Sequence, residues 1–311
     1  MFGIGIITVT IVIDPYGELN FVKTKFNNKK FASNYTTGPF LLSEKLKTDK
    51  YSLIFGTSRT QLVNSSMIHG DLLNYSTSLY ANPSDVYNVL RQFNEIQLRN
   101  INTIYYLVDT HVFTDKKSLY EKLNLHSNID FYRQVFSGLN MKKIHYAISC
   151  VRRNLGRYDN YLNEFGENIY LRHKIFNPKS KIDHFRIPSF TKSSIEYLQK
   201  IDSFCKKENI KIKYFTPVYN IWYLKKVDLE LYRLQFKAFL TVIDKIYDFH
   251  LIDDISYDYN NFTGTDHYNT ITTAKVMSIL ESNESSIIIN EENIDEKFDT
   301  MAIKIREHNG Y

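Results

Sequence analysis

Residues 51–60 read Tyr-Ser-Leu-Ile-Phe-Gly-Thr-Ser-Arg-Thr and join an apolar strand to a sharp polar turn. The apolar run ends at Phe55, and the polar residues after Gly56 are predicted to open a helix. This arrangement presents the hydroxyl of Ser58 at the carboxyl edge of a sheet, beside the free N–H groups of a helix N-terminus. Those N–H groups could stabilise the oxyanion formed when a serine is acylated. The same residues also make ordinary turns, so this segment alone leaves both interpretations open.

The pattern on either side of this stretch predicts an α/β fold. Strand-like segments lie at 53–55, 72–75, 102–108 and 210–216, and helical spacing of apolar residues occurs over 84–98, 193–208, 229–247 and 270–280. A short loop or strand is expected at 287–289, followed by a last helix to about Arg306. Strands that alternate with helices predict a three-layer α/β/α, doubly wound, mostly parallel sheet, with its site at the carboxyl ends of the strands.

The length and composition fit one large domain. The chain has 311 residues, of which 43% are hydrophobic and 15% aromatic, enough for a sizeable core. We expect a single domain over 14–311, interrupted by a helical and loop insertion at about 116–189 that caps the site. The net charge of +5 arises from 39 basic residues spread among 34 acidic ones, which favours no nucleic-acid partner.

An apolar N-terminal segment, 1–13, is stopped by Asp14-Pro15-Tyr16-Gly17. It is shorter than the roughly 20 residues that span a bilayer, and it lacks the basic start and cleavage site of a signal peptide. It is therefore the remnant of a longer anchor, a short membrane-dipping helix or a buried strand. We favour the anchor remnant, which predicts membrane association through the N-terminus and a cell-envelope location facing the periplasm or exterior, with the cytoplasm as the alternative.

The sequence predicts no cofactor and no metal. Two cysteines, Cys150 and Cys205, cannot complete a zinc site by themselves, and their pairing is not readable from sequence. The chain also contains no P-loop and no dinucleotide fingerprint. Three aromatic residues after the 210–216 strand, Tyr219, Trp222 and Tyr223, either stack on a sugar ring or, more commonly for such residues, pack in the core.

A histidine near the other end of the chain could complete a catalytic pair. Residues 261–269 read Asn-Phe-Thr-Gly-Thr-Asp-His-Tyr-Asn and precede the helix predicted at 270–280. His267 would then stand at the entrance of that helix, where it could take the proton of Ser58 and later return it. The alternative is a surface or capping histidine. The catalytic interpretation requires that the two loops meet at the carboxyl edge of one sheet.

Five short motifs occur in a characteristic order: Asp14-Pro15-Tyr16, Gly56-Thr57-Ser58-Arg59, the segments Asn74-Tyr75-Ser76 and Ala81-Asn82-Pro83, Asp109 after a strand and before Phe113, and the block around His267. Over 14–280 this set resembles the SGNH/GDSL-type hydrolases, and more closely their membrane-anchored branch found in bacterial surface-glycan acylation. The resemblance implies a serine esterase or O-acyltransferase. Its acyl-Ser58 intermediate would form with His267 as base, and its acyl group would be acetyl or similar. A cell-surface polysaccharide or an acylated small molecule would be the substrate, and a membrane-bound acyl donor protein a partner.

The sequence departs from the motifs of that family at residues that would surround Ser58 and His267. Gly264 stands where the family has its acid, so we assign Asp266 as the carboxylate, with Asp254 and Asp258 as alternatives. The same departures leave room for a second function, that of a catalytically impaired protein serving in glycan binding or assembly.

The oxyanion and substrate-binding residues are also assigned by resemblance; they are Gly56, Arg59, Ala81, Asn82, Asp109 and Thr110. Ala81 replaces a glycine, and its backbone N–H can still serve as a donor. Asp109 and Thr110 replace the usual asparagine of this block. Because a carboxylate would repel an oxyanion, we prefer Thr110 or a backbone N–H there. Arg59 either binds an anionic group or pairs with a carboxylate.

Overall fold

The computed structural model describes residues 38–76, 81–109, 191–251, 253–263 and 267–308, with isolated positions at 12, 147, 148, 150–152 and 155. The N-terminal segment apart from Val12, nearly all of the predicted insertion, Thr110 and Asp266 lie outside the described residues. Predictions that concern them stay predictions.

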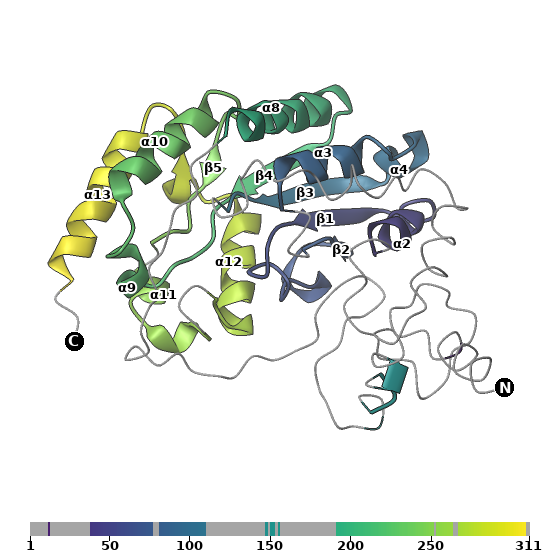
Figure 1. Cartoon of the computed structure of the whole chain (residues 1–311), viewed down its shortest axis with the longest axis horizontal. Helices are drawn as coiled ribbons and strands as arrows, with labels where there is room; N and C mark the ends of the chain where they lie inside the picture. Colours follow the sequence, from purple (N-terminus) through teal and green to yellow (C-terminus); the bar gives the residue numbers. More distant parts are fainter. Residues whose placement is uncertain are drawn as a thin grey trace.

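One six-stranded sheet runs through the described part of the chain (Figure 1). Its strands are β1 (Tyr51–Phe55), β2 (Leu72–Asn74), β3 (Ile101–Leu107), β4 (Lys211–Phe215), β5 (Ile246–Tyr247) and β6 (Ile288–Ile289). They lie in the order β2-β1-β3-β4-β5-β6, all pairs being parallel except β5 with β6. This is a doubly wound order in which the direction of winding reverses between β1 and β3. The predicted mostly parallel α/β sheet is thus confirmed, whereas the SGNH-like detail stays a prediction.

The helices lie on both sides of this sheet (Figure 1). The α-helices are α2 (Gly38–Lys45), α3 (Pro83–Leu90), α4 (Glu95–Arg99), α8 (Lys192–Lys207), α9 (Ile221–Leu224), α10 (Leu229–Leu240), α11 (Asp253–Ser256), α12 (Thr270–Ser282) and α13 (Ile294–Glu307). Short 3-10 helices are η1 (Ser65–Met67), η4 (Tyr259–Asn261) and η5 (Ser285–Ile287). Polar side chains fix several starts: Thr191 caps α8, Asp228 caps α10 and Asn269 caps α12 by accepting a backbone N–H of the first turn.

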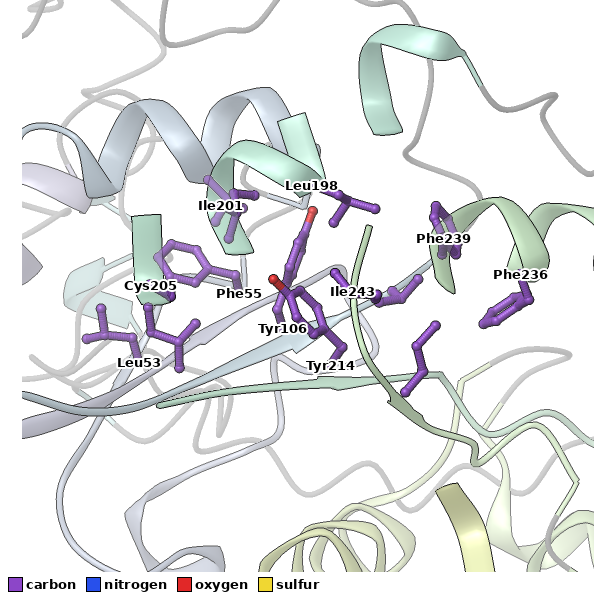
Figure 2. Packing of buried hydrophobic residues seen from close by; sticks show 14 of the residues in the cluster. Leu53, Phe55, Tyr106, Leu198, Ile201, Cys205, Tyr214, Phe236, Phe239 and Ile243 are labelled. Carbon is purple, nitrogen blue, oxygen red and sulfur yellow. The ribbon is translucent and has the colours of Figure 1, made fainter. Parts of the chain in front are cut away.

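Alternation along the strands divides the core into two clusters. Leu53 and Phe55 of β1 face the helices α3, α8, α10 and α13, and Figure 2 shows this cluster with Tyr106 and Tyr214 from the neighbouring strands. Ile54 points to the opposite face, where it shares a second cluster with α12 residues such as Met277. Because successive side chains of a strand point to opposite faces, these fully buried strands need apolar residues at nearly every position.

Two helices have boundaries that differ from those predicted from the sequence pattern. The segment 84–98 forms two helices, α3 and α4, because Asn94 starts a new helix through a capping box with Gln97. The segment 229–247 is helical only as far as Leu240, and Ile246–Tyr247 is the strand β5. The prediction of helix there was wrong because β5 is defined by its partners, β4 and β6, which are remote in sequence. The other predicted strands and helices are confirmed within one or two residues.

The C-terminal end of α12 is fastened to the sheet by polar contacts. The Tyr105 hydroxyl donates to Glu281 at 2.5 Å, and Lys213 Nζ donates to the Leu280 carbonyl at 2.8 Å and lies 3.3 Å from the Glu281 carboxylate. Burial lowers the pKa of Lys213, and Glu281 offsets part of that effect. Burial would raise the pKa of Glu281, but Tyr105 and Lys213 together hold it below its ordinary value. The helix that begins three residues after His267 is therefore held in place at its far end.

We expect Glu281→Gln to lower the free energy of unfolding at pH 7 by about 2 kcal/mol, because the buried Lys213 ammonium loses its counter-charge. The folded carboxyl has a lowered pKa, so its stabilisation is present above the ordinary value of 4.5 and is lost as the pH falls below it. Urea unfolding of wild type and variant at pH 7 and at pH 3.5 (roughly one unit below that value) measures this. Glu292→Gln, at an exposed glutamate, is the control. An equal loss at both pH values would contradict the assignment.

Candidate active site

The turn after β1 exposes one residue to solvent. Every residue from 51 to 60 is buried except Ser58, which is partly exposed. Two successive turns shape the backbone, since the Thr60 N–H donates to the Thr57 carbonyl at 3.0 Å and the Val63 N–H to the Thr60 carbonyl at 3.1 Å. Ser58 thus stands at the carboxyl edge of the sheet, beside the reversal between β1 and β3 where doubly wound folds bind ligands.

No α-helix begins at Ser58, and this part of the prediction was wrong. Turns continue to Leu62, and the next helix is the three-residue η1. The hydroxyl of Thr60 lies 3.0 Å from the Thr57 carbonyl, so a side chain competes for the acceptor that a growing helix would use. Stabilisation of an oxyanion would therefore depend on individual N–H groups of the turn and not on a helix dipole.

Position 56 leaves no room for a side chain, so glycine is needed there. A Cβ atom at this position would collide with the Thr60 hydroxyl and would lie 2.9 Å from the Leu107 Cβ on the adjacent strand. The absence of a side chain lets the turn bend tightly over β3, which brings Ser58 back toward the centre of the sheet edge. Gly56 thus has a steric role in this turn, and its contribution to oxyanion binding stays a prediction.

The last residue of β2 and the residues after it hold the Ser58 turn from a second side. Asn74 is buried, and its side-chain amide donates to the carbonyls of Thr60 at 3.0 Å and Val63 at 2.9 Å. Its Oδ1 accepts the Ser76 N–H at 2.8 Å, and Ser76 Oγ lies 2.7 Å from the Thr60 hydroxyl. The Asn74-Tyr75-Ser76 motif therefore serves to secure the end of the serine turn.

The histidine predicted from the C-terminal part of the chain reaches this serine. Ser58 Oγ lies 2.6 Å from His267 Nε2, although 209 positions separate the two residues. His267 is held by its own loop: its carbonyl accepts the Thr263 N–H at 2.8 Å, and Phe262 and Tyr268 form an antiparallel bridge. When the ring proton is on Nδ1, Nε2 accepts the serine hydroxyl, as a general base must.

The two aspartates predicted as alternatives for the carboxylate behind the imidazole make their described contacts with residues other than His267. Asp254 forms an ion pair with Lys275 of α12, and Asp258 accepts the Asn260 N–H at 2.9 Å at the start of η4. The bonds of these two side chains are thus made within the loop and to α12. Asp266 is outside the described residues, so its assignment as the orienting acid stays a prediction.

Arg59 and Asp109 form a buried ion pair next to the serine. The Arg59 guanidinium donates to Asp109 Oδ2, and the Thr57 hydroxyl donates to the same oxygen at 2.9 Å. The exposed fractions of the two charged side chains are 4% and 0%, so neither faces solvent. Of the two roles considered for Arg59, the structure shows pairing with a carboxylate. The Asp109 side chain is directed at Thr57 and Arg59, and its substrate-binding role stays a prediction.

The other predicted oxyanion residues have structural contacts. Ala81 is fully buried, and its carbonyl accepts the Tyr106 hydroxyl at 2.8 Å. The Asn82 side chain accepts the Ser84 N–H at 3.0 Å and caps α3, with Pro83 in the first turn. These contacts account for the residue types in the Ala-Asn-Pro segment, while their part in binding an oxyanion stays a prediction.

Sequence reasoning missed a second histidine–aspartate pair. His250 Nδ1 lies 2.6 Å from Asp248 and its Nε2 lies 2.5 Å from the Tyr232 hydroxyl. Burial would raise the pKa of Asp248, but His250, with a hydrogen bond from Thr216, lowers it below the ordinary value. His250 is fully buried and stacks on Tyr219. It therefore packs the core beneath the sheet edge, and only the Asp-Phe-His sequence after β5 could have indicated the pair.

The aromatic residues after β4 pack in the core, as the commoner of the two interpretations held. Tyr219 and Tyr223 are buried and stack on each other with ring centroids 4.4 Å apart. Trp222 contacts Tyr259 and His308 edge-on. Cys150 and Cys205 are both buried and are not joined in a disulfide, and burial with the nearby Asp202 raises the pKa of Cys205 to about 12.

Within the described part of the chain, no three histidine, cysteine or acidic side chains gather as metal ligands would. Among the helices that the structure describes, none combines the length and the apolar character needed to cross a bilayer. A search of protein-family models gives no match to this chain, and neither does a search of curated proteins.

We expect Gly56→Ala to destabilise the protein by about 1–3 kcal/mol, because the added methyl group overlaps Thr60 and crowds Leu107. The double variant Gly56→Ala/Thr60→Ala removes the nearest atoms and should regain part of the loss. Urea unfolding midpoints of the three variants give the comparison, with Thr60→Ala alone as reference. Equal stability of wild type and Gly56→Ala would show that the turn is looser than the structure indicates.

Proposed function

We propose that this protein is a serine acyl-transfer enzyme, an esterase or O-acyltransferase, whose nucleophile is Ser58 and whose general base is His267. One observation carries the proposal: the Ser58 hydroxyl and the His267 ring, from loops at opposite ends of the chain, lie within hydrogen-bond distance at 2.6 Å. Both residues are partly exposed, whereas Thr57, Arg59 and Tyr268 beside them are buried. A substrate at the sheet edge would thus meet the hydroxyl and the imidazole first.

The chemistry that follows is a two-step transfer. Ser58 Oγ attacks the acyl carbonyl while its proton passes to His267 Nε2, and the carbonyl oxygen becomes an oxyanion. When the tetrahedral species collapses, the bond to the leaving alcohol breaks and that alcohol takes the proton from His267. Water or a second alcohol then gives up its proton to His267 and attacks the acyl-serine. As the bond between the acyl group and Ser58 Oγ breaks, His267 returns this proton to Ser58 Oγ, which restores the free hydroxyl. Hydrolysis and transfer differ only in this second nucleophile.

Two features of the turn support a preorganised nucleophile. The side chains on either side of Ser58 are fixed by hydrogen bonds to a buried carboxylate, and the backbone two residues after Ser58, at the Thr60 carbonyl, is held by Asn74. Hydroxyls held in one orientation toward a base react faster, because the entropy of alignment is lost before the reaction begins. A surface serine that met a histidine by chance would lack this support.

The substrate class rests on the resemblance described from the motifs. It implies a cell-surface polysaccharide as the acyl acceptor or substrate, an acetyl-type acyl group and a membrane-bound donor protein. Asp14-Pro15-Tyr16, the motif that links the chain to the membrane-anchored branch, lies outside the described residues. We keep the polysaccharide as the first acceptor to be tested and short-chain aryl esters as general acyl donors.

We expect wild-type protein to be labelled at Ser58 by a fluorophosphonate and to cleave aryl acetates. Ser58→Ala should abolish labelling, and both Ser58→Ala and His267→Ala should lower ester turnover by about a thousandfold or more. Ser66→Ala and His69→Ala change exposed residues of the same loop and serve as matched controls that should keep full activity. Mass spectrometry of the labelled protein locates the modified residue.

The same experiment separates the second candidate function, glycan binding or assembly without catalysis. That alternative predicts no labelling of Ser58 and no turnover, together with binding of an acetylated polysaccharide by both wild type and Ser58→Ala. Retention of full activity in Ser58→Ala would end the acyl-transfer proposal.

A further inference from the structure

Asp109 stands at the centre of the residues that surround the nucleophile. It follows β3, and its side chain is fully buried. Its Oδ2 accepts one hydrogen bond from the Thr57 hydroxyl at 2.9 Å and another from the Arg59 guanidinium. These donors are the residues immediately before and after Ser58. A single carboxylate oxygen therefore ties both sides of the serine to the end of the neighbouring strand.

Further contacts extend this attachment to β4. The Arg59 guanidinium lies over the ring of Tyr219, 5.4 Å from its centroid, and Tyr219 follows β4. The Thr57 hydroxyl also lies 3.4 Å from the Arg59 backbone N–H, within the turn itself. Residues that follow β1, β3 and β4 thus meet around one serine. In water each of these contacts would be weak, but a buried charge pair without solvent competition is directional and hard to displace.

The chemistry of these groups indicates alignment and not a direct step in catalysis. Asp109 has no exposed surface, so it cannot touch a substrate, and its described side-chain bonds go to Thr57 and Arg59. Its charge is balanced by the guanidinium, which keeps a bare carboxylate away from a developing oxyanion. This resolves the difficulty that an aspartate, and not an asparagine, occupies the position after β3.

We propose that Asp109 is a positioning residue, which acts through Thr57 and Arg59 to hold the Ser58 hydroxyl in line with His267. The proposal rests on the acyl-transfer function of Ser58. It assigns to the aspartate a role that differs from the oxyanion and substrate-binding role expected of this segment. It also gives Thr57, the middle residue of the Gly-x-Ser turn, a specific role, which is to donate one of the two hydrogen bonds that Asp109 Oδ2 accepts.

The decisive variant is Thr57→Val, which keeps the side-chain shape and the Arg59–Asp109 pair but removes the hydroxyl, and with it the bond to Asp109 and the contact with the Arg59 N–H. We expect the maximal rate of labelling by a fluorophosphonate, kinact, to fall by about ten- to a hundredfold while the half-saturating concentration, KI, stays unchanged, since only alignment is lost. Thr57→Ser restores the hydroxyl and should restore kinact. Asp109→Asn removes the charge that holds Arg59 and should slow labelling further.

Thr216→Val provides a matched control. The Thr216 hydroxyl donates to Asp248 at 3.2 Å at the end of β4 and accepts the Phe249 N–H at 2.7 Å, so this variant also severs one threonine–aspartate bond and one contact with a backbone N–H. It should match Thr57→Val in thermal unfolding temperature but keep wild-type kinact. Equal slowing by both variants, a change in KI alone, or wild-type kinact in Thr57→Val would each overturn the positioning role.

The outcomes also separate this inference from the function on which it rests. If wild type is labelled and Ser58→Ala is not, the acyl-transfer proposal stands whatever Thr57→Val shows. If wild type is not labelled at Ser58, that proposal fails and the positioning role falls with it.

Discussion

The parallel pairing of β1 with β3 is the constraint on which the site depends. Beyond an irregularity between Tyr51 and Leu53 the register is continuous to Phe55, which lies opposite Tyr106, so the two strands end within one residue of each other and their following residues share one edge. Ser58 comes from the first and Asp109 from the second. Because parallel pairing fixes register through many bonds and two buried faces, a slip of one residue would turn every apolar side chain of β1 to the wrong face. The position of Ser58 is thus set by the same interactions that stabilise the core.

The imidazole reaches this edge by a separate route. His267 precedes α12, which lies on the opposite side of the sheet from α8 and α10 (Figure 1). One end of the helix is fixed by Glu281 to Tyr105 and Lys213 in the middle of the sheet. The other end carries the loop whose hydrogen bonds fix the His267 backbone. The 13-residue helix α12 therefore connects the buried Lys213–Glu281 ion pair to the loop of the partly exposed His267.

Sequence alone identified what local patterning and chain order can specify. The strands β1, β3 and β4 are rich in aromatic and aliphatic residues, and α8 and α12 have clear helical spacing and capping residues, so all were predictable. The meeting of Ser58 and His267 was predictable from the rule that site loops gather at the carboxyl edge. The strand β5 was not, since two residues become a strand only through their neighbours. The missing helix after Ser58 depended on side-chain bonds of Thr57 and Thr60, and the buried Arg59–Asp109 pair depended on packing that no single segment records.

The strands at the two ends of the described sheet are short. β2 has three residues and β6 has two, and β6 runs antiparallel to the rest. An outer strand presents unpaired backbone groups on which another chain can assemble, and this risk grows with the length of the strand. Because β2 and β6 are so short, they offer a strand of another chain few unpaired backbone groups for hydrogen bonding. The sheet that carries Ser58 is in this way protected against growth by edge-to-edge aggregation.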